Sequence, residues 1–344
     1  MPLESRPDLD EVAQRWDAFW SGRPLDRPMI LAAIRKPGAP PAEKPYPVRP
    51  ELDIEPVIDQ VLAWADGHHF VGDTVPFFMV EFAAEHFATF LGASLRFHGG
   101  TNWVVPFVKE WDDVEVRFHR DSFYWQQTVE FIRRMRARCD GRVITSSPVL
   151  SAGLDALSAI RGPERLLMDL VDQPENILRA LAGVRRVYHE VVEALAKEVG
   201  WDCFGTTNWL GMYHRGYTNT LQSDVSCMLS PGMFREFEVA SLEHQASHYD
   251  AVAYHLDGPG AVQHLEAVAR ISGIEVIRYV PVPRETPDQI EAVYRRIDAL
   301  GKGIVRWADP ETARRAWWES STRRLVLGMS FESRRAAEEF IASF

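Results

Sequence analysis

Short apolar runs, many of them rich in β-branched residues, alternate along most of the chain with longer segments of helical periodicity. Runs of this kind, bounded by turn residues, are typical of strands that are buried on both faces of a sheet. We predict eight such strands, at residues 28–34, 75–80, 142–146, 202–206, 251–256, 275–280, 303–306 and 324–328. A ninth apolar run, residues 102–108, is expected in an insertion.

The segments between these runs carry helix signals. Residues 175–199 place apolar side chains on one stripe, and Gly200 follows as a stop signal. Thr286 and Gln289 form the pattern of a capping box, with Pro287 at the first helical position. In the last third of the chain, successive predicted strands begin one strand plus one helix apart, which is the βα repeat of a parallel sheet.

Eight strands in this repeat predict an α/β fold, a single (β/α)8 TIM barrel that spans residues 26–344. Residues 1–25 are expected to form an N-terminal helical extension that packs on the barrel. The proline-rich segment 36–56 is expected to be an ordered arm or lid of the barrel domain. A doubly wound sheet is the alternative, but no G-x-G-x-x-G motif follows the first predicted strand.

The amino-acid composition argues against a nucleic-acid-binding protein and against a membrane-spanning one. The 344 residues include 38 basic and 49 acidic side chains, which give a formal net charge of −11 and no overall attraction to nucleic acid. No apolar run reaches the length of a membrane span, and no secretory signal is visible at the N-terminus. The three cysteines, Cys139, Cys203 and Cys227, cannot pair evenly, which favours a reducing, cytoplasmic environment.

The active site of a TIM barrel lies at the carboxyl ends of its strands, so the strand predictions also indicate candidate site residues. The most informative pair is His255 and Asp257, which alternation places on the same side of one strand. An imidazole beside a carboxylate can bind a metal, transfer protons or hold a substrate hydroxyl. Equally, Asp257 could cap a helix or tighten the following Gly-Pro-Gly turn, while His255 is an interior histidine with satisfied hydrogen bonds.

Further candidates follow other predicted strands, each with a structural alternative. Glu81 is a candidate catalytic carboxylate or a solvated loop residue, and Asp155 lines a pocket or caps a helix. Trp103 and Trp209 could stack on a planar ligand, or simply fill volume. Arg35 could meet an anionic substrate or lie on the surface, and Asn208 follows the fourth predicted strand.

Several segments together resemble the uroporphyrinogen decarboxylase superfamily. The first runs from Leu154 through Asp155 to Gly162, and is followed by Leu166-Leu167-Met168-Asp169-Leu170. The second, Leu229-Ser230-Pro231 with Phe234 and Phe237, is similar to the LSPxxFxxF segment of that superfamily. The third is Tyr254-His255-Leu256-Asp257-Gly258-Pro259-Gly260, followed by His264. The resemblance extends from about residue 25 to the C-terminus.

The resemblance implies a (β/α)8 barrel with one of two chemistries. One is cofactor-free decarboxylation of a pyrrolic substrate, and the other is methyl transfer that involves a corrinoid protein. The methyltransferases hold zinc with a His-x-Cys pair and a second cysteine near the C-terminus. This chain instead has His255-x-Asp257, and Phe331 stands where the second cysteine is expected. This departure from the family pattern leaves open a harder nitrogen and oxygen site, with His255, Asp257 and Glu81 as candidate ligands for a divalent transition metal and zinc as the first candidate.

The leading hypothesis is a methyltransferase or demethylase that acts on a small substrate, with a corrinoid or corrinoid protein as partner. His255 and Asp257 would bind the metal or polarise the substrate, with Glu81 as a third catalytic candidate. Asp155, Gln222 and Asp224 would line the pocket, Trp103 and Trp209 would form its walls, and Arg35 and Asn208 complete the substrate-binding candidates. The alternatives are a metal-free decarboxylase of a carboxylated compound and a non-catalytic barrel that binds a tetrapyrrole or corrinoid. The family often pairs its barrels, so a homodimer is expected.

Overall fold

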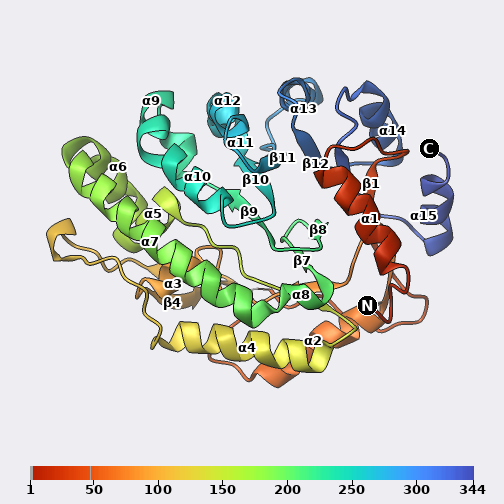
Figure 1. Cartoon of the computed structure of the whole chain (residues 1–344), viewed down its shortest axis with the longest axis horizontal. Coiled ribbons are helices and arrows are strands. Elements are labelled where there is room, and N and C mark those ends of the chain that lie inside the picture. Colours follow the sequence, from red (N-terminus) through yellow and green to blue (C-terminus); the bar gives the residue numbers. More distant parts are fainter. Residues whose placement is uncertain (1–2, 47) are drawn as a thin grey trace.

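The computed structural model describes residues 3–46 and 48–344 and has a mixed α/β architecture (Figure 1). Its largest sheet has seven strands in the order β2-β1-β13-β12-β11-β10-β9. All neighbours in this sheet are parallel except β1 and β2, which are antiparallel. The strands are β1 (Met29–Arg35), β2 (His68–Gly72), β9 (Thr218–Gln222), β10 (Ala251–Asp257), β11 (Ile274–Val280), β12 (Gly303–Trp307) and β13 (Leu325–Gly328).

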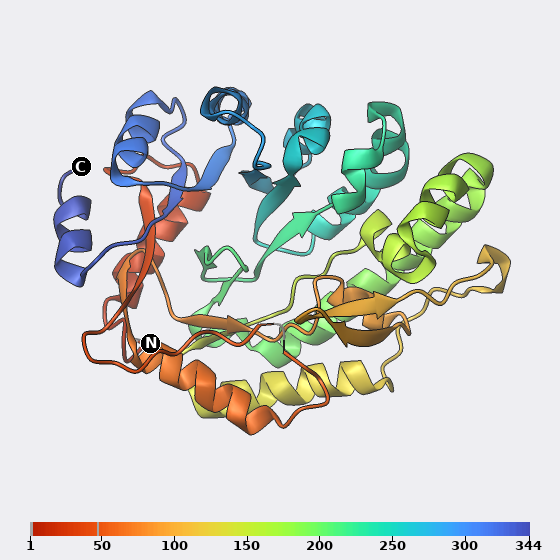
Figure 2. The same ribbon diagram turned by 180° about the vertical axis from the view of Figure 1, so that it is seen from behind.

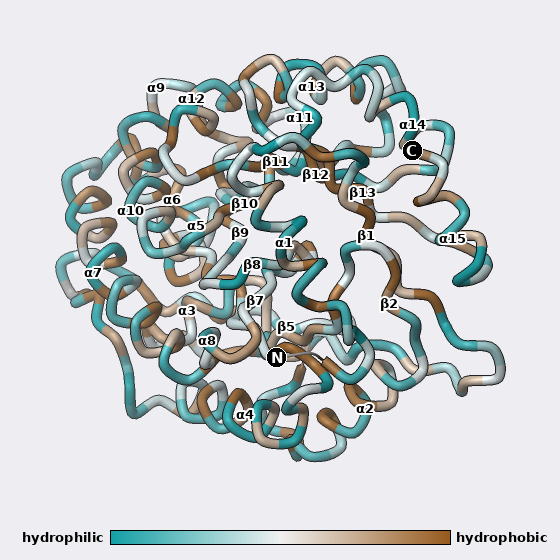
Figure 3. Tube along the Cα trace, turned by 45° about the vertical axis from the view of Figure 1, so that its right-hand side comes forward, coloured by the Kyte–Doolittle hydropathy of each residue, from teal (hydrophilic) through white to brown (hydrophobic). Residues whose placement is uncertain are grey.

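Three short pairs of strands complete the sheet structure. β3 (Phe77–Met79) and β6 (Ile144–Ser146) are parallel. β4 (Ser94–His98) with β5 (Thr101–Val105), and β7 (Thr206–Thr207) with β8 (Tyr213–His214), are antiparallel hairpins. Viewed along the ring in Figure 3, β1 and β9 to β13 follow one another around a centre, with β7 and β8 next to β9.

Side chains bridge the places where backbone pairing around the ring is interrupted. Between β1 and the segment before β3, the Ala32 N–H donates to Thr74 Oγ1 at 2.7 Å. Between β6 and β7, the Thr207 N–H donates to Ser146 Oγ at 3.1 Å. The fold is thus a mostly parallel α/β arrangement consistent with a TIM-like barrel, and no closed ladder of backbone pairs runs through the described residues.

One buried apolar cluster fills the interior at the amino ends of the strands. Six strands each contribute to it: Met29 in β1, Ile144 in β6, Ala253 in β10, Val276 in β11, Val305 in β12 and Val326 in β13. The helix α1 (Leu9–Trp20) adds Trp16 and Phe19 to the same cluster, and the Trp16 indole N–H donates to the Asp73 carbonyl at 2.9 Å. α1 therefore covers this end of the strand ring (Figure 3), and the carboxyl ends are left for the site.

The other helices lie outside the strands (Figures 1 and 2). A second large apolar core fills the space between helices and strands. The longer ones are α2 (Ile54–Asp66), α4 (Phe123–Cys139), α5 (Gly153–Arg161), α6 (Pro163–Asp172), α7 (Pro174–Val199), α10 (Val239–Ala246), α13 (Pro287–Ala299), α14 (Pro310–Glu319) and α15 (Arg334–Ile341). The shorter segments are α3 (His86–Phe90), η1 (Trp111–Asp113), α8 (Trp201–Phe204), η2 (Asp224–Met228), α9 (Pro231–Met233), the π-helical η3 (Phe234–Glu238), α11 (Gly258–Ala261), η4 (Val262–His264) and α12 (Leu265–Ala269).

Two helix ends follow directly from the sequence. The capping box at the start of α13 forms as predicted, because the Gln289 N–H donates to Thr286 Oγ1 and the Gln289 side chain accepts from the Thr286 N–H. α7 ends at Gly200, whose φ of 61° is the left-handed conformation that glycine adopts at low cost. A Cβ at this position would also meet the Arg136 guanidinium, but that flexible side chain could move, so the positive φ is the reason for glycine here.

Seven of the eight predicted strands coincide with observed ones, and the prediction at residues 202–206 is wrong. Most of that segment forms the short helix α8, which Gly205 ends, and only Thr206 lies in a strand. The strand that pairs with β10 is β9, whose sequence Thr-Asn-Thr-Leu-Gln has no apolar run. Two of its polar side chains are buried with hydrogen bonds: Thr218 Oγ1 donates to the Ala251 carbonyl, and the Asn219 amide donates to Tyr249 Oη.

The two predicted irregular segments have different outcomes. Within the apolar run at 102–108, residues up to Val105 form β5, the second strand of an antiparallel hairpin outside the main sheet. The described part of the proline-rich segment has neither helix nor strand before α2 begins at Ile54, and Pro47 lies outside the described residues.

The division into a helical extension at 1–25 and a barrel at 26–344 stays a prediction. None of the helices in the described ranges is both long and apolar enough to cross a membrane.

Candidate metal and substrate site

Strand alternation brings one layer of side chains to the carboxyl end of the ring. Ala253 in β10 and Val276 in β11 belong to the interior cluster, so residues two positions further along each strand face the same side. These residues are His255, followed by Asp257, and Arg278, and β10 and β11 pair His255 directly with Arg278. The inward-facing layer of the strands thus changes from apolar to ionisable at the carboxyl end.

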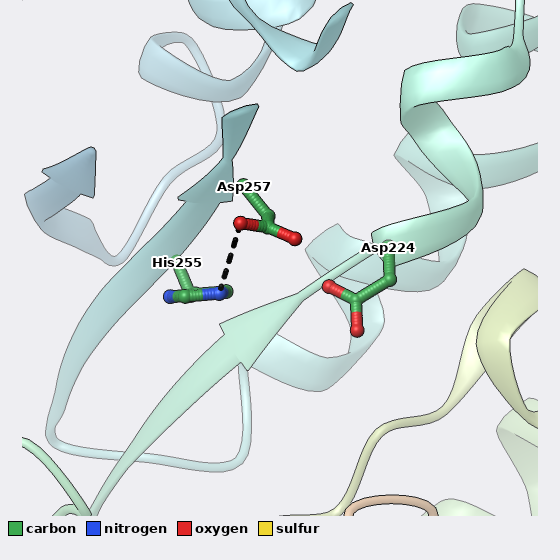
Figure 4. A group of neighbouring side chains, drawn as sticks. All are labelled: Asp224, His255 and Asp257. Atoms are coloured by element: carbon green, nitrogen blue, oxygen red, sulfur yellow. Dashed lines mark ion pairs between the residues drawn. The ribbon is translucent and has the colours of Figure 1, made fainter. Parts of the chain in front are cut away.

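Three side chains converge at this end of the sheet: Asp224 from η2, and His255 and Asp257 from β10 (Figure 4). Each offers one potential ligand atom, and these atoms all lie within 4.8 Å of one another. His255 Nε2 is 4.0 Å from Asp257 Oδ1. One imidazole nitrogen and two carboxylate oxygens are a donor set that suits a divalent transition metal.

Asp224 is held in this position by Asp155, which comes from the start of α5. The Asp155 carboxylate accepts hydrogen bonds from the backbone N–H groups of Asp224 at 2.9 Å and Val225 at 3.0 Å. The Gln222 amide also donates to Asp224 Oδ2 at 3.0 Å. The structure therefore brings together four of the predicted residues, Asp155, Gln222, His255 and Asp257, around Asp224.

Burial favours the uncharged forms of Asp224, Asp155 and His255 and so shifts their pKa values. Desolvation raises the pKa of Asp224 to about 8, and the negative charges of Asp155, Asp257 and Glu85 add to the effect. Desolvation likewise raises the pKa of Asp155 to about 6, although its two backbone hydrogen bonds oppose the shift. Burial lowers the pKa of His255 to about 4, with a smaller contribution from Arg278. His255 is consequently neutral at physiological pH, which leaves a nitrogen lone pair for a cation.

Asp224 and His255 line a cavity of about 500 Å³, large enough for a small organic molecule. Its walls are mostly apolar, with a few polar groups. The lining residues are Lys44, Pro45, Tyr46, Phe77, Phe78, Met79, Glu81, Ala84, Val149, Trp209, Gln222, Asp224 and His255. A second cavity of about 290 Å³ shares Gln222 and Asp224 with the first and is also lined by Trp103, Asp155 and Glu85.

Glu81 is a buried carboxyl group in the wall of the larger cavity. It follows β3, and its Oε1 accepts a hydrogen bond from the Val149 N–H at 3.2 Å. Desolvation raises the pKa of Glu81 to about 8, despite that hydrogen bond. Glu81 therefore carries a proton at neutral pH and can donate it to a molecule in the cavity.

The remaining predicted residues take different positions. Trp209 lines the larger cavity, and its ring centroid lies 5.3 Å from that of His255. Asn208 has a structural position, because its Oδ1 accepts from the Leu210 and Met212 N–H groups and closes the turn between β7 and β8. Trp103 is exposed on β5 and lines only the smaller cavity. Arg35 is exposed at the end of β1 and lines neither of these two cavities.

Two cations near the site were not anticipated. Lys44, from the proline-rich segment, lines the larger cavity with its Nζ 3.5 Å from the ring centroid of Phe77, and burial lowers its pKa to about 7. The local sequence around Lys44 contains no signal for this. Arg278 did carry a signal, because it lies between the buried apolar residues Ile277 and Tyr279 of β11, and a charged side chain there requires a partner or a ligand. Phe331, at the expected cysteine position, packs beside Phe340 in the apolar core.

No protein-family model matches the chain, and no curated protein matches its sequence. Among solved structures, the chain is similar to a methyltransferase from Methanosarcina mazei, with a TM-score of 0.63 over 96% of both chains. The sequence identity in this comparison is 13%. The likeness thus extends over nearly the whole molecule, and at this identity it establishes a shared fold.

Proposed function

We propose that this protein is a metal-dependent methyltransferase related to the uroporphyrinogen decarboxylase superfamily, acting on a small molecule in the cavity of about 500 Å³. The observation that carries the proposal is the convergence of Asp224, His255 and Asp257 at the carboxyl end of the sheet. The likeness to a methyltransferase over 96% of the chain supports it at the level of fold.

Asp224, His255 and Asp257 would hold the metal, for which zinc is the first candidate. When bound, such an ion supplies a Lewis acid that lowers the pKa of a coordinated thiol or hydroxyl and makes it a nucleophile. The buried, unpartnered Nδ1 of His255 and the neutral state of its ring agree with a ligand role, because protonated imidazole cannot coordinate a cation. Phe331 stands where the resemblance implied a cysteine ligand, so no thiolate is present at that position. Asp224 would supply a carboxylate ligand instead.

The chain's own residues would then orient the reactants. Phe77, Met79 and Val149 form an apolar wall that excludes water from the acceptor. Glu81, protonated at neutral pH, would donate a hydrogen bond to the bound molecule. The methyl group would pass as a cation equivalent from the cobalt of a corrinoid, free or protein-bound, to the thiol or hydroxyl after its proton has been released to solvent. The electron pair of the broken carbon–cobalt bond would stay on cobalt, which is reduced from Co(III) to Co(I), while the new carbon–sulfur or carbon–oxygen bond forms.

The test measures loss of methyl groups from free methylcobalamin by its visible absorbance, with a panel of small thiols as acceptors. The metal-loaded protein should accelerate demethylation above the protein-free rate, and chelator-treated protein and the Asp257→Ala variant should not. A rate equal to the protein-free rate with zinc, cobalt and manganese alike would contradict the proposal. The variant His98→Ala, at an exposed histidine, is the control for effects of purification and metal loading on the rate.

Glu81 favours a second candidate function, cofactor-free decarboxylation. When a carboxylate leaves as carbon dioxide, the carbon left behind must take up a proton, and a carboxyl group with a pKa of about 8 can supply it at neutral pH. Lys44 would attract the anionic substrate. Release of carbon dioxide from carboxylated pyrroles by exhaustively chelated protein, lost in Glu81→Gln, would favour this candidate over methyl transfer.

A further inference from the structure

Arg278 presents a guanidinium with no acceptor at the carboxyl end of the sheet. Its Cζ lies 4.7 Å from the ring centroid of Trp209 and 4.7 Å from that of Trp307. Within residues 3–46 and 48–344, its side chain makes neither a hydrogen bond to an acceptor nor an ion pair with a carboxylate. By contrast Arg306, on the next strand, forms an ion pair with Glu291 at 2.6 Å.

The packing of neighbouring side chains fixes the position of the Arg278 guanidinium. Arg278 is on the inward face of β11, directly paired with His255, and Trp209 contacts both side chains. Trp307 ends β12 and can lie where it does because Gly328 has no side chain, since a Cβ there would be 2.7 Å from the Trp307 indole nitrogen. Two indoles therefore fix the arginine next to the predicted metal ligands.

Burying a guanidinium without a hydrogen-bond acceptor costs free energy, which the binding of an anionic ligand would offset. Burial lowers the pKa of Arg278, and the indole contacts give it no hydrogen-bond acceptor. The negative charge of Asp257 favours the charged form but lies beyond ion-pair distance. The five N–H donors of the guanidinium thus remain free to bind an oxyanion.

We propose that Arg278 binds a carboxylate group of the substrate, beside Asp224, His255 and Asp257. This deepens the proposed function, since it names the substrate class for the same site, an acid whose apolar part lies in the adjoining cavity. A planar carboxylate pairs with a guanidinium through two parallel hydrogen bonds. A single carboxylate also matches a single arginine in charge, whereas the second negative charge of a phosphate dianion would be repelled by Asp257 nearby.

The test uses metal-free protein, so that its outcome does not depend on whether the metal proposal is right. Equilibrium dialysis measures the binding of radiolabelled hexanoate, which has one carboxylate and an apolar tail suited to a cavity lined by Phe77 and Met79. Arg278→Gln should weaken hexanoate binding by about tenfold or more, because it removes a charge-assisted pair. Arg278→Lys, which keeps the charge and loses the fork, should give a smaller loss.

A matched control exists on the outer surface of the molecule. The Arg323 guanidinium also contacts two tryptophans, Trp317 at 5.0 Å and Trp318 at 4.8 Å, but it belongs to the segment after α14. Arg323→Gln should leave hexanoate binding unchanged, and uncharged hexanamide should compete poorly in the wild type. The proposal is overturned if hexanoate does not bind, if Arg278→Gln and Arg278→Lys both bind it normally, or if hexanamide or hexylphosphonate competes better than hexanoate itself.

Discussion

At the scale of single residues, buried carboxyl groups determine how the site is built. Asp155 and Glu81 have raised pKa values because they lie among apolar walls and other carboxylates, yet each accepts a backbone hydrogen bond that fixes a neighbouring segment. Asp155 fixes Asp224, and Glu81 fixes Val149 in the cavity wall. Their roles in positioning and in proton transfer can therefore be separated by substitution.

Asp155→Ala should weaken metal binding without removing a ligand. The change removes both acceptors for the backbone N–H groups of Asp224 and Val225, so the Asp224 carboxylate is no longer held toward His255. Groups that orient metal ligands typically contribute about 10–100-fold in affinity, and we expect a loss in this range for zinc. Competition with a chromogenic chelator measures it. Unchanged affinity in a folded Asp155→Ala protein would show that Asp155 does not position the site.

Glu81→Gln should remove a component of the pH dependence of stability. The folded pKa of about 8 lies above the ordinary 4.5, so the stabilising contribution of the protonated form is complete below pH 4.5 and is lost as pH rises toward 8. The substituted amide keeps an acceptor for the Val149 N–H and does not ionise. The variant should match the wild type at pH 5 and exceed its free energy of unfolding by roughly 3–5 kcal/mol at pH 9.

Urea unfolding of metal-free protein at the two pH values checks this, because the other buried acids contribute equally to wild type and variant. Parallel pH profiles for the two proteins would mean that Glu81 is ionised in the folded state at neutral pH. That result would also remove the basis for Glu81 as a proton donor.

Sequence reasoning could find the residues that regular structure positions, but missed those that depend on long-range packing. His255 and Asp257 follow from alternation along one strand, which is a local property. Lys44 lies in an irregular segment, and only tertiary packing against Phe77 brings its amine to the cavity. Asn208 follows a predicted strand, and its Oδ1 closes a local turn that only the structure reveals, while its role toward substrate stays a prediction.

At the scale of elements, the helix α1 is where the predicted N-terminal helix lies, packed on the strands. It packs across the amino ends of the strands, and its Trp16 and Phe19 are fully buried there. The strands themselves were largely predictable because parallel, doubly buried strands are apolar runs. β9 was not, because its burial relies on threonine and asparagine hydrogen bonds that no apolar pattern reveals.

Trp16→Ala should destabilise the whole protein. The substitution leaves a cavity between α1 and the strands and removes the hydrogen bond to the Asp73 carbonyl, so a loss of about 3–5 kcal/mol is expected. Urea unfolding measures the loss, with the exposed Trp318→Ala as a matched control within about 0.5 kcal/mol of the wild type. A small effect of Trp16→Ala would show that α1 packs only loosely on the ring.

At the scale of the whole molecule, side-chain hydrogen bonds join strands whose backbones do not pair. Ser146 Oγ joins β6 to β7, and Thr74 Oγ1 joins β1 to the segment before β3. The predicted α/β class is confirmed as a mostly parallel fold consistent with a TIM-like barrel, while the interruptions in backbone pairing could not be predicted from the number of strands. They depend on individual hydroxyl groups whose partners lie far away in sequence.

Ser146→Ala should lower stability although it changes a single small atom. The substitution removes the acceptor for the buried Thr207 N–H, and an unpaired buried donor costs about 1–3 kcal/mol. Thr74→Val tests the other bridge in the same way. Chemical unfolding of both variants should show losses in this range, and stabilities equal to that of the wild type would mean that neither bridge holds the ring together.

The most direct test of the account is the metal content of untagged protein, prepared without chelator and measured by elemental mass spectrometry. The account predicts about one equivalent of a divalent transition metal per chain after exposure to zinc. His255→Ala, Asp257→Ala and Asp224→Ala should each lose it, while His98→Ala, at an exposed histidine, should keep it. A wild-type protein that binds no metal, or variants that retain it fully, would contradict the assignment of Asp224, His255 and Asp257 as a metal site.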